Sequence, residues 1–244
     1  MKLNEQIRQD RERFSKLPDR QSKLHLLWDY YKIPIIIGIA ALIFLFAFIK
    51  DYRQNSRPKY LEAILINSDL AYSYDDSLRE DFIDYAGVDT GKYNLSIDSS
   101  LVISEEDYDQ MTMANMQKVV AMYTAGELDV VIGPDTLMDR YGAMGAHMDL
   151  GGILTDELLK ELKDNGFEIF YATEYKEDEN GVSEPARTYP AGVYIDSSVY
   201  LAGLGNDGAY ATQLKAGRRP VFTITASCTR TENALRLLKM IAGL

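Results

Sequence analysis

The stretch AGELDVVIGPDTLMDRYGAMG, residues 125–145, joins a continuous apolar run to a short helical pattern. The run LDVVIG, residues 128–133, carries one charged side chain, Asp129, near its start. Such a run is typical of a strand that is covered on both faces in a parallel sheet. Pro134 cannot donate a hydrogen bond to a sheet and suits the first turn of a helix, which we predict over 135–145. The stretch therefore predicts one strand-then-helix unit of an α/β fold.

The rest of the chain beyond residue 58 shows the same alternation of strand and helix patterns. Strands are predicted where short runs rich in Ile, Leu, Val and Tyr occur, at 59–67, 93–98, 167–175, 188–196 and 220–227. Helices are predicted where apolar residues recur at steps of three and four, at 75–87, 105–125, 155–166 and 231–244. Asn180-Gly181 is a hairpin signal, so the strands on either side are expected to pair antiparallel. An α/β fold with a mixed sheet follows.

Three of these helices carry more specific expectations. The helix at 155–166 is expected to have Thr155 as its N-cap and Gly166 at its C-terminal end. The helix at 105–125 has a row that we interpret as core packing rather than a methionine-rich binding groove, formed by Met113, Met116, Val120 and Tyr123. The last helix is expected to bury one apolar row, formed by Ala234, Leu238 and Ile241.

Residues 33–49, IPIIIGIAALIFLFAFI, contain no charged or hydrogen-bonding side chain and lie between Lys32 and Lys50. Seventeen residues are at the short end of a bilayer span. Aromatic and basic residues flank the run, as they do at membrane interfaces: Trp28, Tyr30, Tyr31 and Tyr52. A cleaved signal peptide fits less well, because no small-residue cleavage site follows the run. We predict one transmembrane helix.

The basic residues favour an N-terminus inside the cell. Close to the span the two sides tie at four basic residues each, but the tail 1–32 holds eight in all. The chain is therefore predicted to be a single-pass protein of the cell membrane, with a cytoplasmic tail at 1–32, the span at 33–49, a linker at 50–59 and an extracytoplasmic domain at 60–244. One cysteine, Cys228, excludes an internal disulfide and points to a bacterial envelope.

Residues 51–244 contain 17 basic and 32 acidic side chains, a net charge of −15. A nucleic-acid partner is therefore not expected, because binding nucleic acid requires a basic face. The chain has two histidines, His25 and His147, and we expect His147 to be a surface or loop residue rather than a metal ligand. No complete set of catalytic residues is found, Cys228 included. We predict no enzymatic activity, no metal and no cofactor.

Two further motifs are interpreted as turns. Gly203, Gly205 and Gly208 have the spacing GxGxxG, but the next predicted element is a strand rather than a helix, so a glycine-rich turn is expected. The acidic run EDENG at 177–181 lacks the ligand order of a calcium loop and is expected to be the solvated tip of a hairpin.

The order of these segments resembles that of extracellular solute-binding proteins of the periplasmic-binding-protein type II class. The likeness lies in Ala125-Gly126, in the strand at 128–133, in the short helix after it and in Asp149-Leu150. Two later segments, YPAGVYIDSS and ENALRLLKMI, resemble a crossover strand and a terminal helix of that class. The resemblance implies a two-lobed, mixed-sheet α/β domain preceded by one transmembrane helix. It also implies a non-catalytic binding or sensory domain for a small solute or peptide.

Ligands of open α/β sheets sit outside the carboxyl ends of the strands. Asn67 and Ser68 follow the first predicted strand, and Gly133 and Asp135 end the strand quoted above. With Tyr189 and Tyr194 on the predicted hairpin as stacking surface, these six residues are the predicted ligand site. Asn67, Ser68 and Asp135 are equally compatible with helix caps. The alternative function is a structural or interaction protein of the cell envelope with a degenerate solute-binding fold and membrane-protein partners.

Overall fold

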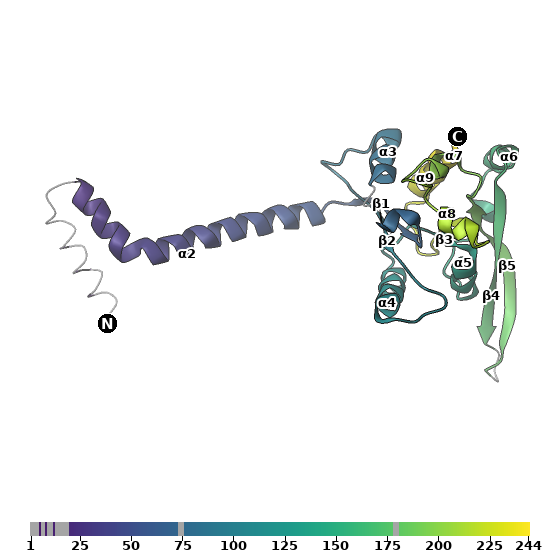
Figure 1. Ribbon diagram of the computed structural model, residues 1–244, viewed down its shortest axis with the longest axis horizontal. Helices are drawn as coiled ribbons and strands as arrows, with labels where there is room; N and C mark the ends of the chain where they lie inside the picture. The colour runs from purple at the N-terminus through teal and green to yellow at the C-terminus, as the bar shows by residue number, and fades with distance from the viewer. Residues whose placement is uncertain (1–4, 6–7, 9–11, 13–19, 73–75, 178–180) are drawn as a thin grey trace. The chain divides into compact units, whose positions relative to one another are not determined.

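The computed structural model describes residues 5, 8, 12, 20–72, 76–177 and 181–244 of the chain (Figure 1). The chain divides into two compact units, Met1–Ser56 and Arg57–Leu244. Most of the tail 1–19 and Asn180 of the hairpin signal lie outside the described residues.

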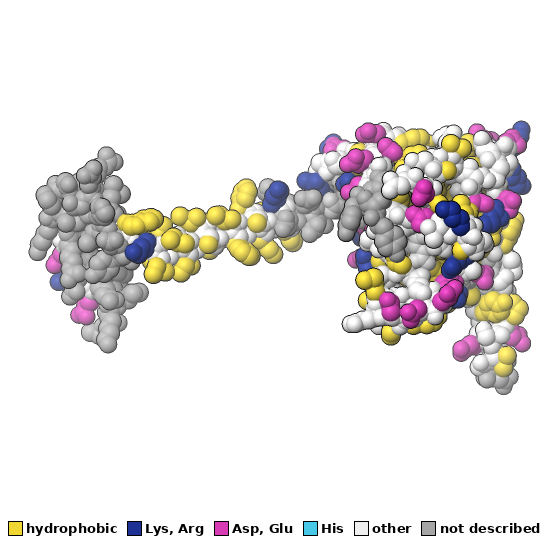
Figure 2. All heavy atoms as spheres, in the orientation of Figure 1, with side chains coloured by type: hydrophobic (Ala, Val, Ile, Leu, Met, Phe, Trp, Pro, Cys, Tyr) yellow, Lys and Arg dark blue, Asp and Glu magenta, His cyan; other side chains and the backbone are white. Residues whose placement is uncertain are grey.

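The first unit contains helix α2, Arg20–Asn55, with Pro34 inside it. Its segment Lys32–Lys50 is long and apolar enough to cross a membrane, and none of it is buried against the protein. Hydrophobic side chains cover this segment (Figure 2), and Trp28 and Tyr52 beside it are exposed. The helix continues to Asn55, across part of the predicted linker. The same length and composition fit a membrane anchor and a signal sequence.

The second unit is built on one six-stranded mixed sheet with the order β2-β1-β3-β6-β5-β4. The strands are β1 Lys59–Ile66, β2 Asn94–Leu101, β3 Val130–Pro134, β4 Glu168–Glu177, β5 Ser183–Tyr194 and β6 Pro220–Ile224. Strands β2, β1 and β3 are parallel, whereas β6, β5 and β4 each run antiparallel to the neighbour before them in this order. The predicted α/β class and mixed sheet are confirmed.

Helices cover both faces of this sheet (Figure 1). The α-helices are α3 Ser77–Ala86, α4 Gln110–Thr124, α5 Asp135–Ala143, α6 Asp156–Asp164, α7 Val199–Ala202, α8 Ala211–Lys215 and α9 Thr231–Ala242, and two short 3-10 helices are η1 Asp69–Tyr72 and η2 Leu150–Gly152. One face packs mainly against α3, α6, α7 and α9, and the other against α4 and α5. Alternate residues of β1 face opposite sides, because Ala63 and Leu65 belong to the first core and Ile64 and Ile66 to the second.

Most of the predicted elements are confirmed within a few residues. The strand at 128–133 is β3, whose five residues are all buried. Thr155 caps α6, because its hydroxyl accepts a hydrogen bond from the Leu158 N–H at 3.2 Å. The predicted antiparallel pair is β4 and β5, which is longer than expected and runs beyond the end of the sheet (Figure 1).

Three expectations are not met in full. The predicted core row on α4 is confirmed for Met116 and Tyr123, which pack against the second core. It is wrong for Met113 and Val120, which are half exposed, because the buried residues of this helix are Thr112 and Val119. The helix also begins at Gln110, after Asp109 as N-cap, and not at residue 105. The second lobe implied by the resemblance is not seen, because residues 57–244 form one compact unit and the described residues of that unit contain one sheet.

Candidate functional site

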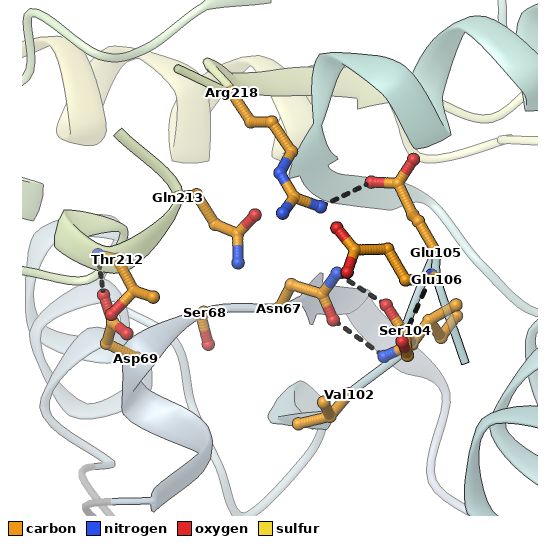
Figure 3. A pocket seen from close by; sticks show the side chains of 11 residues that line it. Asn67, Ser68, Asp69, Val102, Ser104, Glu105, Glu106, Thr212, Gln213 and Arg218 are labelled. Carbon is orange, nitrogen blue, oxygen red and sulfur yellow. Dashed lines mark hydrogen bonds and ion pairs between the residues drawn. The ribbon is translucent and has the colours of Figure 1, made fainter. Parts of the chain in front are cut away.

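A cavity of about 380 Å³ opens at the carboxyl ends of β1 and β2 (Figure 3). We call it the carboxyl-edge cavity, and its lining is Asn67, Ser68, Asp69, Val102, Ile103, Ser104, Glu105, Glu106, Thr212, Gln213 and Arg218. After β1 the chain turns to a helix on one face of the sheet, and after β2 it turns to a helix on the other. Diverging connections of this kind leave a crevice at the switch point of an α/β sheet, which is where ligands bind.

Asn67 shapes the floor of the cavity. Its φ of 56° is in the left-handed region, which asparagine tolerates better than most residues. Its Oδ1 accepts from the Ile103 N–H at 2.7 Å, and its Nδ2 donates to the Ile103 carbonyl at 2.8 Å. The side chain thus pairs with the backbone as another strand residue would, and holds the connection after β2 in place. Asn67 is therefore not a helix cap, and both the oxygen and the nitrogen of its amide are already hydrogen-bonded within the protein.

Glu105 forms one wall of the cavity and neutralises Arg218. Its Oε1 accepts from Arg218 Nη1 at 3.1 Å and from the Thr136 hydroxyl at 2.6 Å. Its Oε2 lies 3.5 Å from Arg140 Nη2. Only 10% of the Glu105 side chain is exposed, so three donors surround an acid that is almost out of water. This cluster ties the connection after β2 to α5 and to the start of β6.

Asp69 forms the opposite wall. Its Oδ2 accepts from the Thr212 N–H at 2.8 Å, and its own N–H donates to the Ala209 carbonyl at 2.7 Å. Ser68 is buried between the walls, and its hydroxyl donates to the Ser99 carbonyl at 3.3 Å. These bonds attach the first turn after β1 to α8, so the cavity has fixed walls on both sides.

Two polar side chains of the lining have hydrogen-bonding capacity to spare. The Glu106 carboxylate has no hydrogen-bond or ion-pair partner in the part of the chain that the structure describes, and Figure 3 shows it pointing between Arg218 and Asn67. The Oε1 of Gln213 is buried and has no hydrogen-bond partner among the described residues. Figure 3 shows its amide reaching into the space between Thr212 and Arg218. Polar groups left unpaired at a cavity are available to a ligand.

Asp135 and Tyr194 lie along the same edge of the sheet but in a separate group. The Asp135 N–H donates to the Arg219 carbonyl at 2.9 Å, and the Arg219 guanidinium stacks 3.9 Å above the Tyr194 ring. Burial raises the pKa of Tyr194, and the Asp135 carboxylate adds to that rise. Arg219 donates to both oxygens of Asp196, at 2.8 and 3.0 Å, which raises the pKa of the guanidinium. A bidentate pair of this kind makes the group a fixed patch of the surface.

The six predicted site residues are therefore not all brought together. Asn67 and Ser68 line the carboxyl-edge cavity, and Asp135 and Tyr194 lie on the same edge outside its lining. Gly133 is buried in β3, where an added Cβ would meet the Met138 methyl group at 2.9 Å. Tyr189 is 2% exposed and lies toward the other edge, where its hydroxyl donates to the His147 carbonyl at 3.3 Å.

Cys228 and His147 have the properties of buried structural groups. Burial raises the pKa of the Cys228 thiol to about 11, and its bond to Asp129 adds to that rise, so little nucleophilic thiolate forms at neutral pH. His147 lies in the connection after α5 but is buried rather than at the surface, and burial lowers its pKa to about 4. The described residues contain no group of three or more His, Cys, Asp or Glu side chains that could hold a metal ion.

Sequence reasoning missed most of the cavity lining. The polar run SEE at 104–106 follows β2, and RR at 218–219 precedes β6, so both runs lie at strand ends of the carboxyl edge. The rule that places ligands outside the carboxyl ends of strands would have found the first run if the strand at 93–98 had been extended to Leu101. The second run lies at this edge because β6 is antiparallel to β3, so that β6 begins where β3 ends. The direction of β6 cannot be predicted from the residues of β6 alone.

The polar side chains of the cavity lining are hydroxyls, amides, carboxylates and one guanidinium. Some of these groups are hydrogen-bonded to neighbouring residues and others have no partner among the described residues. None of these described side chains forms a pair of nucleophile and base.

Comparison of the chain with models of known protein families, with curated proteins and with solved structures finds no match.

Proposed function

We propose that residues 57–244 form a non-catalytic domain that binds a small polar solute in the carboxyl-edge cavity, as the receptor part of a membrane-attached sensor or transport assembly. The single observation that carries this proposal is the cavity itself. It has a volume of about 380 Å³, which falls in the range of small-molecule sites. Its lining comes from three separate segments, 67–69, 102–106 and 212–218, that converge at the switch point of the sheet.

We expect a solute from a broad library to raise the melting temperature of the full chain in detergent micelles, because a ligand that binds only the folded state stabilises it. Thr212 is exposed and lines the cavity, so Thr212→Trp should fill the space and weaken binding of that solute at least about tenfold. The matched control is Thr124→Trp, at the exposed C-terminal end of α4, which should leave binding unchanged. Calorimetric titration measures both.

A flat response to the whole library would contradict the binding function. It would favour the second candidate, an interaction protein of the cell envelope. A different observation supports that candidate, because large apolar side chains are exposed on one segment of the surface. These are Tyr108, Met111, Met113 and Val120, at and just before α4, each more than half exposed. Exposed apolar groups that lie close together are typical of surfaces that contact another protein.

We further propose that α2 is a retained membrane anchor, with the N-terminus in the cytoplasm and the domain outside. The support is the apolar segment Lys32–Lys50, together with the eight basic residues of the tail 1–32. An uncleaved helix holds the binding domain at the membrane surface, where it can hand a captured solute or a signal to a membrane protein.

Protease added to protoplasts should remove the 27.6 kDa chain and leave a small membrane-embedded fragment that carries the N-terminus. An epitope tag on each end, followed by immunoblotting, measures which end is protected. Complete protection of the C-terminal tag would reverse the orientation. Release of the domain into the medium without protease would show that the helix is a cleaved signal sequence. Protoplasts lysed with detergent are the control, because there the protease should digest both tagged ends.

A further inference from the structure

We infer that the ligand of the carboxyl-edge cavity carries an ammonium group, held by the Glu106 and Asp69 carboxylates; this inference rests on the proposed binding function. The lining of the cavity is negatively charged overall. It contains three acidic side chains, Asp69, Glu105 and Glu106, and one basic side chain, Arg218. A ligand that enters this cavity therefore meets an excess of negative charge.

Some of the charges in the lining are already balanced by ion pairs within the protein. Arg218 is paired with Glu105, and Arg140 approaches the other oxygen of the same carboxylate. The guanidinium is thus committed within the protein and is not a free site for an anionic ligand. Glu106 has no such partner among the described residues, and the hydrogen bond to the Asp69 carboxylate comes from a neutral backbone N–H. Within the described part of the chain, two carboxylates of the lining remain without a cation.

The two carboxylates without a cation among the described residues lie on opposite sides of the cavity. Figure 3 shows Asp69 and Glu106 on opposite sides of Ser68 and Asn67, with the cavity between them. A second, smaller cavity of about 170 Å³ shares Asp69 and Thr212 with the first, and its lining adds one acidic and one basic side chain, Asp207 and Lys215. Because Asp69 and Glu106 both line the carboxyl-edge cavity, an elongated ligand with an amine at each end can contact both carboxylates there. The buried Oε1 of Gln213, unpaired among the described residues, offers a further acceptor if its amide turns toward the ligand.

The net charge of the domain also favours a cationic ligand. Residues 51–244 have a net charge of −15, and acidic side chains are spread over the face seen in Figure 2. A field of this sign attracts cations and repels carboxylates and phosphates over about one Debye length, roughly 8–10 Å at physiological salt. The domain as a whole therefore favours the same class of ligand as the cavity.

The test compares three probes that share a four-carbon chain and differ only in their end groups. They are 1,4-diaminobutane, butane-1,4-diol and butanedioate, titrated calorimetrically into the full chain in detergent micelles. We expect the diamine to bind at least about tenfold more tightly than the other two, and its affinity to fall as sodium chloride is added. A blocked Gly-Lys-Gly peptide shows whether the ammonium comes from a free amine or from a lysine side chain, and either supports the inference.

Two variants test the carboxylates. Glu106→Gln and Asp69→Asn each remove one charge and keep the shape of the side chain, and each should weaken diamine binding about tenfold. Neither should move the melting temperature of the free protein by more than a degree or two. The Glu106 carboxylate has no partner among the described residues to lose, and the amide oxygen introduced by Asp69→Asn can still accept from the Thr212 N–H. Glu161→Gln, exposed on α6, is the control and should leave binding unchanged.

The outcomes separate this inference from the proposed function. Tighter binding of the diol or the dianion, or diamine binding that both charge variants leave unchanged, overturns the ammonium inference. If a library solute binds in the cavity by the Thr212→Trp criterion while the diamine does not bind, the proposed function stands and the inference fails. If no library solute and no probe binds, both fail together.

Discussion

Asp129→Ala is expected to lower the free energy of unfolding of the domain by about 3–5 kcal/mol, because it breaks a buried ion pair from one side. Asp129 is fully buried directly before β3, which begins at Val130. Its Oδ2 accepts from Arg230 Nε at 2.8 Å and from the Glu62 N–H at 2.9 Å. Its Oδ1 accepts from the Cys228 thiol at 3.2 Å. The alanine variant leaves three donors without an acceptor, and Arg230 is only 26% exposed.

Urea unfolding of the fragment 57–244, followed by circular dichroism, measures this loss. Asp139→Ala is the matched control, because Asp139 is exposed on α5, and its replacement should change the free energy of unfolding by less than about 0.5 kcal/mol. Asp129→Asn should fall between the two, since an amide oxygen can still accept from the Glu62 N–H but carries no charge for Arg230. Equal stability of the Asp129→Ala and Asp139→Ala variants would contradict a structural role for this ion pair.

The fold was largely predictable because the apolar runs of the strands and the three-and-four spacing of the helices can each be recognised within a short stretch of sequence. A five-residue apolar run such as β3 can be covered on both faces only inside a sheet flanked by helices. The strand order and the antiparallel entry of β6 depend instead on contacts between distant segments, such as Val130 with Ile224. The row on α4 was predicted only in part for a related reason. Its helical spacing is correct, but packing decides which side faces the sheet, and that side carries Thr112 and Val119 together with Met116 and Tyr123.

The site was predicted only in part, because the second strand was predicted to end three residues before Leu101 and because the predicted site included residues that do not lie at a strand end. Asn67 and Ser68 were found because they directly follow a predicted strand. Tyr189 and Tyr194 were grouped as one stacking surface, yet five residues of extended strand separate them by about 16 Å. Tyr194 consequently lies at the end of β5, beside Arg219, whereas Tyr189 lies in the middle of that strand, beside His147. A single sequence cannot show that Arg218 and Arg219 turn to different partners.

His147 explains why the domain should be sensitive to mild acid. It is 1% exposed, its Nε2 lies 2.8 Å from the Met138 carbonyl, and its Nδ1 is buried with no hydrogen-bond partner among the described residues. The neutral ring with its proton on Nε2 can donate to Met138 and leaves Nδ1 as an unpaired acceptor. A second proton would have to sit on Nδ1, in an apolar core and without an acceptor. Burial therefore lowers the pKa of His147 to about 4, despite the opposing effect of the Met138 bond.

A pKa that is lower in the folded state than in the unfolded chain means that the unfolded state binds the proton more tightly. The stability contributed by neutral His147 is therefore fully present above pH 6.5 and is lost as the pH falls toward about 4. For a shift of this size, we expect a loss of about 2 kcal/mol between pH 7 and pH 5 and about 3 kcal/mol by pH 4. His147 is the only histidine of the fragment 57–244, so no other imidazole contributes in this window.

His147→Gln should remove this part of the pH dependence, because a glutamine amide can donate to the Met138 carbonyl and does not titrate. The measurement is the difference in the free energy of unfolding between pH 7 and pH 5, in urea, for the wild-type fragment and the variant. We expect the wild type to lose about 2 kcal/mol more than the variant over this interval. The comparison uses the change with pH, so a variant that is less stable at pH 7 still gives a valid result. Equal losses in both proteins would contradict this account, because they would mean that the folded protein binds the second proton on His147 as readily as the unfolded chain does.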